Sequence, residues 1–300
     1  MPARKRRVVF FIEPEWAYGS IHYELCKYLW AYDIDCRVMP WLKPYDREEF
    51  TDLVNSVDLV VSNTGVTGAL AAYNMPLDKL VLMAHGDFDL NLYAKEKQFD
   101  LRDCAGYAVI TNRLVGYSAA CGIERVPTVA HVGINTNTFY QPVAKSLTRV
   151  GYAGAWGDRH SLELKRPYLI ERAAQQAGLE FHAAVWRQHS FTTMPGWYGS
   201  VGAVMIASTN EAAGMPSLEA AAAGRLLLTT PVGSWPDRIS PTGGIALPME
   251  EDAYVEEATA HLVFYKNNPE AYRLKCEQIQ EHAQSYDWSK VIHEWVELLG

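Results

Sequence analysis

The stretch that decides the fold runs from residue 203 to residue 224 and reads AVMIASTNEAAGMPSLEAAAAG. An apolar run of strand length, 203–207, leads into a polar loop and then into a helix that begins near Met215 or Pro216, and proline is favoured at the first helical position. Free N–H groups at such a helix start, together with the helix dipole, form an anion site suited to a diphosphate. Gly214 lets a ligand approach the backbone closely.

Two carboxylates flank this helix start. Glu211 precedes the predicted helix, and Glu219 lies about one turn inside it. Both can accept hydrogen bonds from hydroxyls on the two sugars that flank a diphosphate, so the geometry fits a nucleotide-sugar. Taken alone, the pair is a weak signal and favours a surface loop residue followed by an ordinary amphipathic helix.

The rest of the chain repeats a short apolar run, a turn and a longer amphipathic stretch, which predicts parallel sheets covered by helices on both faces. In the first half we predict strands at 8–12, 35–39, 59–62, 80–84, 107–111 and 128–132, and helices at 20–32, capped by Ser20, and 46–56. The polar segment 133–148 predicts an interdomain connection. A second series follows, with strands at 150–153, 181–185, 203–207, 226–229 and 245–247 and helices at 162–177 and 215–223.

Length and composition are those of a globular protein of about two domains, with 300 residues, 49% of them hydrophobic and 21% charged. The net charge of -8 disfavours a surface broadly attractive to nucleic acid. The basic run Arg4 to Arg7 favours a solvated N-terminus, with a weak membrane or phosphate contact as the alternative.

Five cysteines without a C-x-x-C pair indicate a reducing compartment, with neither a disulfide framework nor a zinc site. The first apolar run, 8–12, is too short for a signal peptide core or a membrane span. We therefore expect a cytoplasmic protein, either free or peripheral to the membrane.

Residues 210–224 resemble the E-G-F-G-L-P-x-L-E-A-M-A-C-G segment of glycosyltransferase family 4, a large retaining family with the GT-B fold. Three further segments match that family in the same order along the chain. GINTNTFYQP at 133–142 resembles its N-G-V-D-x-x-x-F-x-P linker, TPVGS at 230–234 its S-D-V-G-G turn, and YDW at 286–288 the F-x-W start of its closing helix. The resemblance covers residues 105–300 well and the first hundred only loosely.

This resemblance implies the GT-B fold, an α/β architecture of two Rossmann-like doubly wound domains that face each other across a cleft. Residues 1–145 would form the acceptor-side domain, 146–285 the nucleotide-sugar-binding domain, and 286–300 a C-terminal helix that packs back towards the N-terminal domain. The implied reaction is a retaining, metal-independent transfer of a sugar from a UDP-sugar or GDP-sugar to a hydroxyl of a saccharide or lipid-linked saccharide. Nucleic acid is not an expected partner.

The resemblance also implies roles for residues of the 210–224 segment. Glu211 would contact the donor sugar, and Glu219 the nucleotide ribose. The backbone between them would line the sugar and the diphosphate, with Ser217 and Leu218 as better amide donors than Pro216, which has no N–H. The residues concerned are Gly214, Met215, Pro216, Ser217 and Leu218.

Members of the family neutralise the diphosphate with an arginine and a lysine that follow the first strand of the C-terminal domain. Ala155 occupies the expected arginine position, so Arg159 and Lys165 are the predicted equivalents, with Arg166 as an alternative. A solvated helix face is the other interpretation of Lys165 and Arg166. Fixed cations and oriented amides stabilise charge on a leaving β-phosphate without a metal, so we predict neither a metal site nor a cofactor.

In the first half, His85 follows the predicted strand 80–84, at the end where doubly wound sheets bind ligands. His85-Gly86-Asp87 resembles the H-D element of the family, whose histidine faces the donor sugar, although Gly86 is an addition. The triplet from Asp87 to Asp89 also matches the D-x-D of metal-dependent glycosyltransferases of another fold, which we interpret as a coincidence. Gly19, in the segment WAYGS at 16–20, occupies the place of the family's G-G loop and is a predicted donor contact.

Several alternatives remain open on the sequence. The departures at Ala155 and around Gly19 also fit a catalytically weak or inactive binding or accessory protein. A transferase acting on a small molecule or a modified DNA base is a further alternative. A phosphorylase or epimerase of the same fold is disfavoured because no cofactor-attaching lysine is evident.

Overall fold

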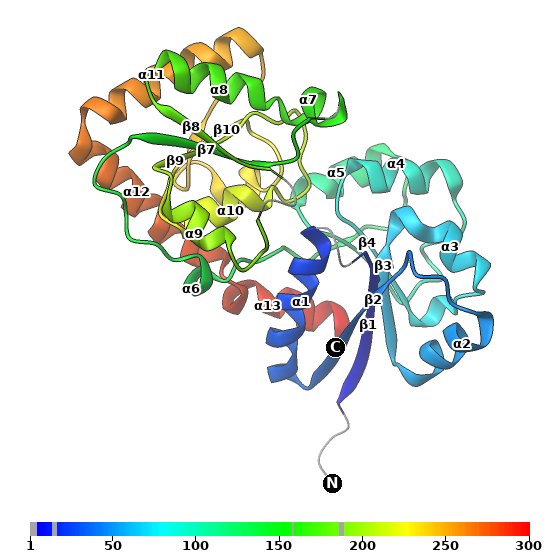
Figure 1. Cartoon of the computed structure of the whole chain (residues 1–300). Coiled ribbons are helices and arrows are strands. Elements are labelled where there is room, and N and C mark those ends of the chain that lie inside the picture. The colour runs from blue at the N-terminus through cyan, green and yellow to red at the C-terminus, as the bar shows by residue number, and fades with distance from the viewer. Residues whose placement is uncertain (1–4, 14–16, 158, 186–188) are drawn as a thin grey trace. The chain divides into compact units, whose positions relative to one another are not determined.

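A computed structural model describes residues 5–13, 17–157, 159–185 and 189–300. The chain divides into two compact units, one formed by Met1–Gly133 with Trp288–Gly300 and the other by Ile134–Asp287 (Figure 1). Arg4 of the basic run and Trp16 lie outside the described residues. None of the helices that the described residues form is both long and apolar enough to span a membrane.

The first unit is built on a parallel sheet with the strand order β2-β1-β3-β4-β5-β6. Its strands are β1 Arg6–Ile12, β2 Ile34–Pro40, β3 Leu59–Asn63, β4 Leu80–Ala84, β5 Gly106–Val109 and β6 Thr128–Val129. β1, β3 and β4 consist largely of buried apolar side chains because helices cover both faces of such a sheet. The predicted strands therefore lie close to the observed ones.

The helices of the first unit are α1 Ala17–Leu29, α2 Arg47–Ser56, α3 Thr67–Ala72, α4 Asp87–Glu96, α5 Asn112–Ala120 and α13 Trp288–Leu299. Asp46 caps α2 by accepting a hydrogen bond from the Glu49 amide at 2.7 Å, in agreement with the predicted helix. α1 begins before Ser20, so the predicted cap at that residue is wrong.

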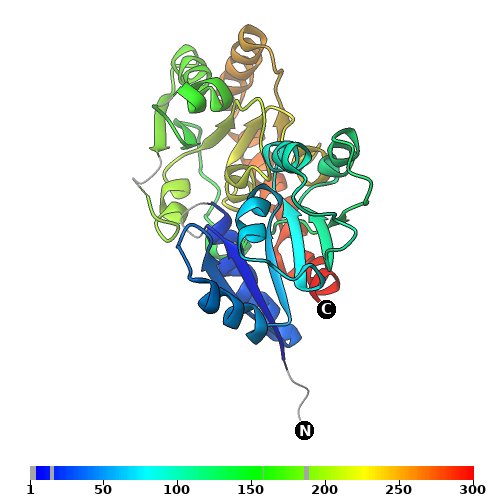
Figure 2. The same cartoon turned by 90° about the vertical axis from the view of Figure 1, so that its right-hand side faces the viewer.

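α13 completes the first unit, although it is the last helix of the chain (Figure 1; Figure 2). The indole of Trp295 is fully buried against Phe10 and His22, and its Nε1 donates to the carbonyl of His131 at 2.8 Å. The Glu294 carboxylate accepts from the His131 amide at 2.7 Å. These contacts attach α13 to β1, α1 and the segment after β6.

The second unit contains a parallel sheet with the order β11-β10-β9-β7-β8. Its strands are β7 Arg149–Gly154, β8 Glu180–Val185, β9 Ala203–Ile206, β10 Leu226–Thr229 and β11 Ile245–Ala246. Its helices are α6 Thr136–Phe139, α7 Arg159–Lys165, α8 Pro167–Gln176, α9 Met194–Gly199, α10 Met215–Ala222, α11 Glu251–Asn267 and α12 Pro269–Ala283. α8 and α11 lie on one side of this sheet and α9 and α10 on the other (Figure 1).

The predicted helix 162–177 is two helices in the structure. Arg166 adopts a left-handed conformation, with φ of 47°, and Pro167 opens α8. Proline disfavours a helical conformation in the residue before it, which explains why α7 ends at Lys165.

The polar segment after Gly133 is part of the second unit. The Ile134 amide donates to the Tyr286 carbonyl at 3.0 Å, and the Thr136 hydroxyl donates to the Asp287 carboxylate at 2.7 Å. Phe139 is fully buried in the core of this unit. The units are therefore divided at Gly133 and Ile134, earlier than the predicted boundary at residue 145.

Candidate functional site

The loop from β9 to the start of α10 forms the centre of the candidate site. Gly214 caps α10 in a left-handed conformation, with φ of 68° and ψ of 55°, which explains the glycine because L-residues rarely adopt these angles. Pro216 stands in the first turn, where the missing N–H costs no intrahelical hydrogen bond.

Not every amide of this first turn is directed outward. The Ser217 amide donates to the Gly214 carbonyl at 2.8 Å, and the Leu218 side chain is fully buried. Because Pro216 has no N–H, Gly214 and Met215 supply the amides at the tip of the helix. The Ser217 amide is thus engaged within the turn and the Leu218 side chain belongs to the core, and donation from these two amides to a ligand stays a prediction.

Glu211, Lys165 and Ser208 form a compact polar cluster beside this helix start. Glu211 Oε1 accepts from Lys165 Nζ at 2.6 Å and from Ser208 Oγ at 2.7 Å. The Lys165 side chain is 30% exposed and that of Glu211 14% exposed. The structure therefore brings together two of the predicted catalytic residues and adds Ser208 as a partner.

Neighbouring segments hold the loop in place. The Thr209 amide donates to the Leu164 carbonyl at 2.8 Å, which fixes the loop next to the end of α7. From the 230–234 turn, Thr230 Oγ1 donates to the Ser208 carbonyl at 2.6 Å and Ser234 Oγ to the Ala213 carbonyl at 2.7 Å. A Cβ on Gly233 would lie 3.0 Å from the Ala213 oxygen, so this turn packs directly against the loop.

Glu219 lies in α10, and its Oε2 accepts a hydrogen bond from the hydroxyl of Tyr198 in α9 at 2.7 Å. Burial raises the pKa of Glu219 from 4.5 to about 7, although the hydrogen bond from Tyr198 lowers it. Burial, followed by the neighbouring Glu219, raises the pKa of Tyr198 well above its ordinary value. Tyr198 therefore stays protonated and donates the hydrogen bond.

The two arginines proposed for the diphosphate lie in different environments. Arg166 is buried, and its guanidinium donates to the Ala207 carbonyl at 2.7 Å and to the Met249 carbonyl at 2.8 Å, so it holds the backbone of the second unit. Arg159, at the start of α7, is 91% exposed and pairs with Glu163 on the same helix at 2.7 Å. Of the three candidate cations, Lys165 is the one in contact with Glu211.

His85 follows β4 in the first unit, as predicted. The Asp89 carboxylate accepts from the His85 amide at 2.8 Å and from the Gly86 amide at 3.1 Å, which closes the first turn of α4. The imidazole is buried, its Nδ1 lies 3.4 Å from the side-chain amide of Asn63, and its ring centre lies 5.5 Å from that of His22. Burial, and then His22, lowers the pKa of His85 well below 6.5, so the ring is neutral near pH 7.

The D-x-D triplet has structural partners. Asp89 caps α4 as described above, and Asp87 accepts hydrogen bonds from both terminal nitrogens of Arg113, at 2.6 and 3.1 Å. Within residues 5–13, 17–157, 159–185 and 189–300 the structure contains no group of three or more His, Cys, Asp or Glu side chains that could hold a metal.

Gly19 lies inside the first turn of α1 and is buried, so it is helical and does not lie in an open loop.

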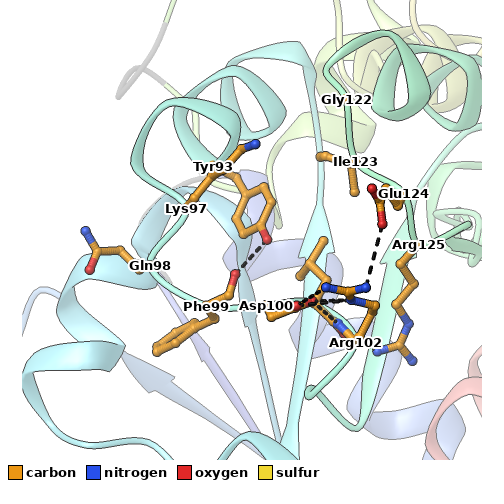
Figure 3. Close-up of a pocket in the computed structure, with 11 residues that line it drawn as sticks. Tyr93, Lys97, Gln98, Phe99, Asp100, Arg102, Gly122, Ile123, Glu124 and Arg125 are labelled. Atoms are coloured by element: carbon orange, nitrogen blue, oxygen red, sulfur yellow. Dashed lines mark hydrogen bonds and ion pairs between the residues drawn. The ribbon is translucent and has the colours of Figure 1, made fainter.

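A separate pocket of about 360 Å³ lies in the first unit, between the segment that follows α4 and the one that follows α5 (Figure 3). These segments lead into the N-terminal ends of β5 and β6. His85 follows the C-terminal end of β4 and so lies at the other edge of this parallel sheet. The polar groups around the pocket bind one another: Arg102 pairs with Asp100 at 2.6 Å, and the Tyr93 hydroxyl donates to the Phe99 carbonyl at 2.8 Å. We assign no ligand to this pocket.

Neither a protein-family model nor a curated protein sequence matches the chain. Solved structures do match it over nearly its whole length. A sucrose-phosphate synthase from Thermosynechococcus elongatus is 11% identical and superposes with a TM-score of 0.74 over 98% of both chains. A glycosyltransferase from Rickettsia africae is 11% identical, with a TM-score of 0.72, and covers 99% of this chain and 98% of its own.

Anabaena HepE, solved in complex with UDP and glucose, is 14% identical and has a TM-score of 0.64 over 98% of this chain and 99% of its own. At these identities the likeness concerns the fold. The two parallel sheets flanked by helices and the full-length superpositions confirm the predicted fold class: the chain adopts the GT-B fold, with two Rossmann-like α/β units.

Proposed function

We propose that the protein is a retaining glycosyltransferase that moves a sugar from a nucleoside diphosphate sugar to an acceptor hydroxyl without a metal ion. The observation that carries this proposal is the cluster of Glu211, Lys165 and Ser208 at the N-terminus of α10. A carboxylate and a cation beside a helix start, whose first amides lack intrahelical acceptors, match the hydroxyls and phosphates of such a donor.

The donor would extend along the first turn of α10. Glu211, held by Lys165 and Ser208, would accept hydrogen bonds from hydroxyls of the transferred sugar. The diphosphate would lie at the amides of Gly214 and Met215. Glu219, further along the helix, would accept hydrogen bonds from the ribose hydroxyls.

Transfer forms a bond between the acceptor oxygen and the anomeric carbon and breaks the bond between that carbon and the β-phosphate oxygen. Negative charge grows on the β-phosphate, and the acceptor hydroxyl gives up its proton. Lys165 and the helix-start amides would stabilise the growing charge, because they are fixed before the reaction begins. His85, neutral near pH 7, would make an uncharged hydrogen bond to the donor sugar.

Likeness to solved structures supports the donor and the acceptor that we propose. The HepE complex contains UDP and glucose, which makes UDP-glucose the first donor to test. GDP-sugars are the alternative, and a saccharide or lipid-linked saccharide is the proposed acceptor. A cytoplasmic location, with the enzyme free or peripheral to a membrane, stays a prediction.

The test begins with thermal unfolding of the purified chain in the presence of UDP, GDP and their sugars, followed by donor hydrolysis and transfer assays. We expect one base to raise the melting temperature and Lys165→Met to lower kcat by about 100-fold. Glu256→Gln, on the exposed face of α11, is the control and should match the wild type. Binding without any turnover would instead identify an accessory protein.

Two further readouts address the mechanism. Nuclear magnetic resonance of the product should show the same anomeric configuration as the donor, and EDTA should leave the rate unchanged. Loss of activity in EDTA with recovery in Mn²⁺ would refute the metal-independent mechanism, and inversion would refute retention.

A further inference from the structure

Tyr198 is placed to control the orientation of Glu219. It is fully buried at the end of α9, and its hydroxyl donates to Glu219 Oε2 at 2.7 Å. The phenol ring is held edge-on by Phe139, at 5.9 Å between ring centres, and by Trp197, at 4.9 Å. A ring clamped in this way gives its hydroxyl a single position, so one carboxylate oxygen of Glu219 is fixed.

We propose that Tyr198 is a positioning residue that holds the Glu219 carboxylate so that its second oxygen accepts hydrogen bonds from the donor ribose. The proposal rests on the proposed function, in which Glu219 contacts the ribose. A glutamate side chain has several rotatable bonds, and ordering it on binding costs conformational entropy. With Tyr198 in place, the carboxylate is ordered before the donor arrives.

The core of the second unit does not require a hydrogen bond from every buried tyrosine. Tyr254 and Tyr286 are fully buried, and their hydroxyls have no hydrogen-bond partner among the described residues. Tyr198 differs because its partner is an ionisable group of the candidate site. Tyr254→Phe is therefore a matched control for Tyr198→Phe, since both remove one buried hydroxyl from the same unit.

The hydrogen bond also couples Tyr198 to the protonation of Glu219. α10 packs against α6, α9, α12, β9 and β10, and Tyr198 is the titratable side chain from these elements that shifts the pKa of Glu219 among the described residues. Burial raises that pKa to about 7 and Tyr198 lowers it. Without the hydroxyl the pKa rises further, so a higher pH is needed to ionise the carboxylate.

The experiment measures kcat and the donor KM of wild type, Tyr198→Phe and Tyr254→Phe across the pH range. We expect Tyr198→Phe to raise the donor KM about tenfold near pH 7, the effect of one charge-assisted hydrogen bond, with little change in kcat. The acidic limb of its kcat/KM profile should move to higher pH. Tyr254→Phe should leave both quantities at wild-type values.

Glu219→Gln separates this proposal from the proposed function. If Glu219→Gln leaves the donor KM unchanged, Glu219 is not a donor contact and the proposed function loses that role. If Glu219→Gln raises KM while Tyr198→Phe behaves like Tyr254→Phe, the positioning role alone is overturned. A double variant with Glu219→Ala, which removes the acceptor of the Tyr198 hydroxyl, supplies a second check that needs no pH profile, because adding Tyr198→Phe to Glu219→Ala should have far less effect than Tyr198→Phe alone.

Discussion

Replacing Glu219 with glutamine is expected to stabilise the second unit above pH 7. The carboxyl is partly buried, and burial raises its pKa from 4.5 to about 7 in the folded protein. At a pH between these two pKa values, the carboxyl group of residue 219 carries a proton in the folded protein but has released it in the unfolded chain. Stability contributed by this group is therefore present below pH 4.5 and is lost as the pH rises through about 7.

The size of the effect follows from the same interval. Each pH unit between the two pKa values contributes about 1.4 kcal/mol, so the interval corresponds to at most ~3.5 kcal/mol. Because part of the side chain still contacts solvent, we expect ~2 kcal/mol. Glutamine keeps an acceptor for the Tyr198 hydroxyl and cannot ionise, so it avoids this cost.

The assay is urea unfolding of wild type and Glu219→Gln at about pH 5 and about pH 8.5, followed by a signal from the second unit. The two proteins should differ little at the lower pH, and the variant should be more stable at the higher pH. Glu256→Gln, an exposed helix glutamate of the same unit, controls for the loss of a negative charge. A stability difference that does not change with pH would refute the reasoning.

Two other substitutions test the backbone and the cap that shape the candidate site. Gly214→Ala should lower stability by about 1 kcal/mol and weaken nucleotide binding in a UDP titration, because alanine is strained at a φ of 68°. Gly116 lies in the middle of α5 with open space around a new Cβ, so Gly116→Ala should leave the stability of the protein unchanged or raise it. Equal effects of the two substitutions on stability would contradict this explanation. Asp89→Ala should cost about 1–2 kcal/mol in thermal unfolding because two amides at the start of α4 lose their acceptor, whereas an unchanged melting temperature would show that water replaces the carboxylate.

The parts of the fold that the sequence predicts well are those that depend on local pattern. The strands at 59–62, 80–84, 203–207 and 226–229 are apolar except for Ser62 and Thr229 at the ends of two of them, and the structure has β3, β4, β9 and β10 there. A strand that is buried on both faces of a sheet does not alternate polar and apolar residues. A short apolar run is therefore enough to predict it. The start of α10 was predictable from local signals as well, since Gly214 permits the left-handed conformation of the cap and the ring of Pro216 restricts its own φ to helical values.

The parts that were not predicted depend on contacts between distant segments. No periodicity indicates that Tyr198 of α9 meets Glu219 of α10, or that Ser208 turns towards Glu211 and Lys165. The division between α7 and α8 did have a local signal, because Pro167 disfavours a helical Arg166.

α13 has a consequence for the order in which the protein is made. Trp295 is synthesised long after Phe10, although its indole fills a space beside that residue of β1. All strands of the second sheet are synthesised before Trp295, so the second unit can close while the first still lacks an aromatic side chain. A nascent chain halted after Gly133 would present that uncovered surface to chaperones.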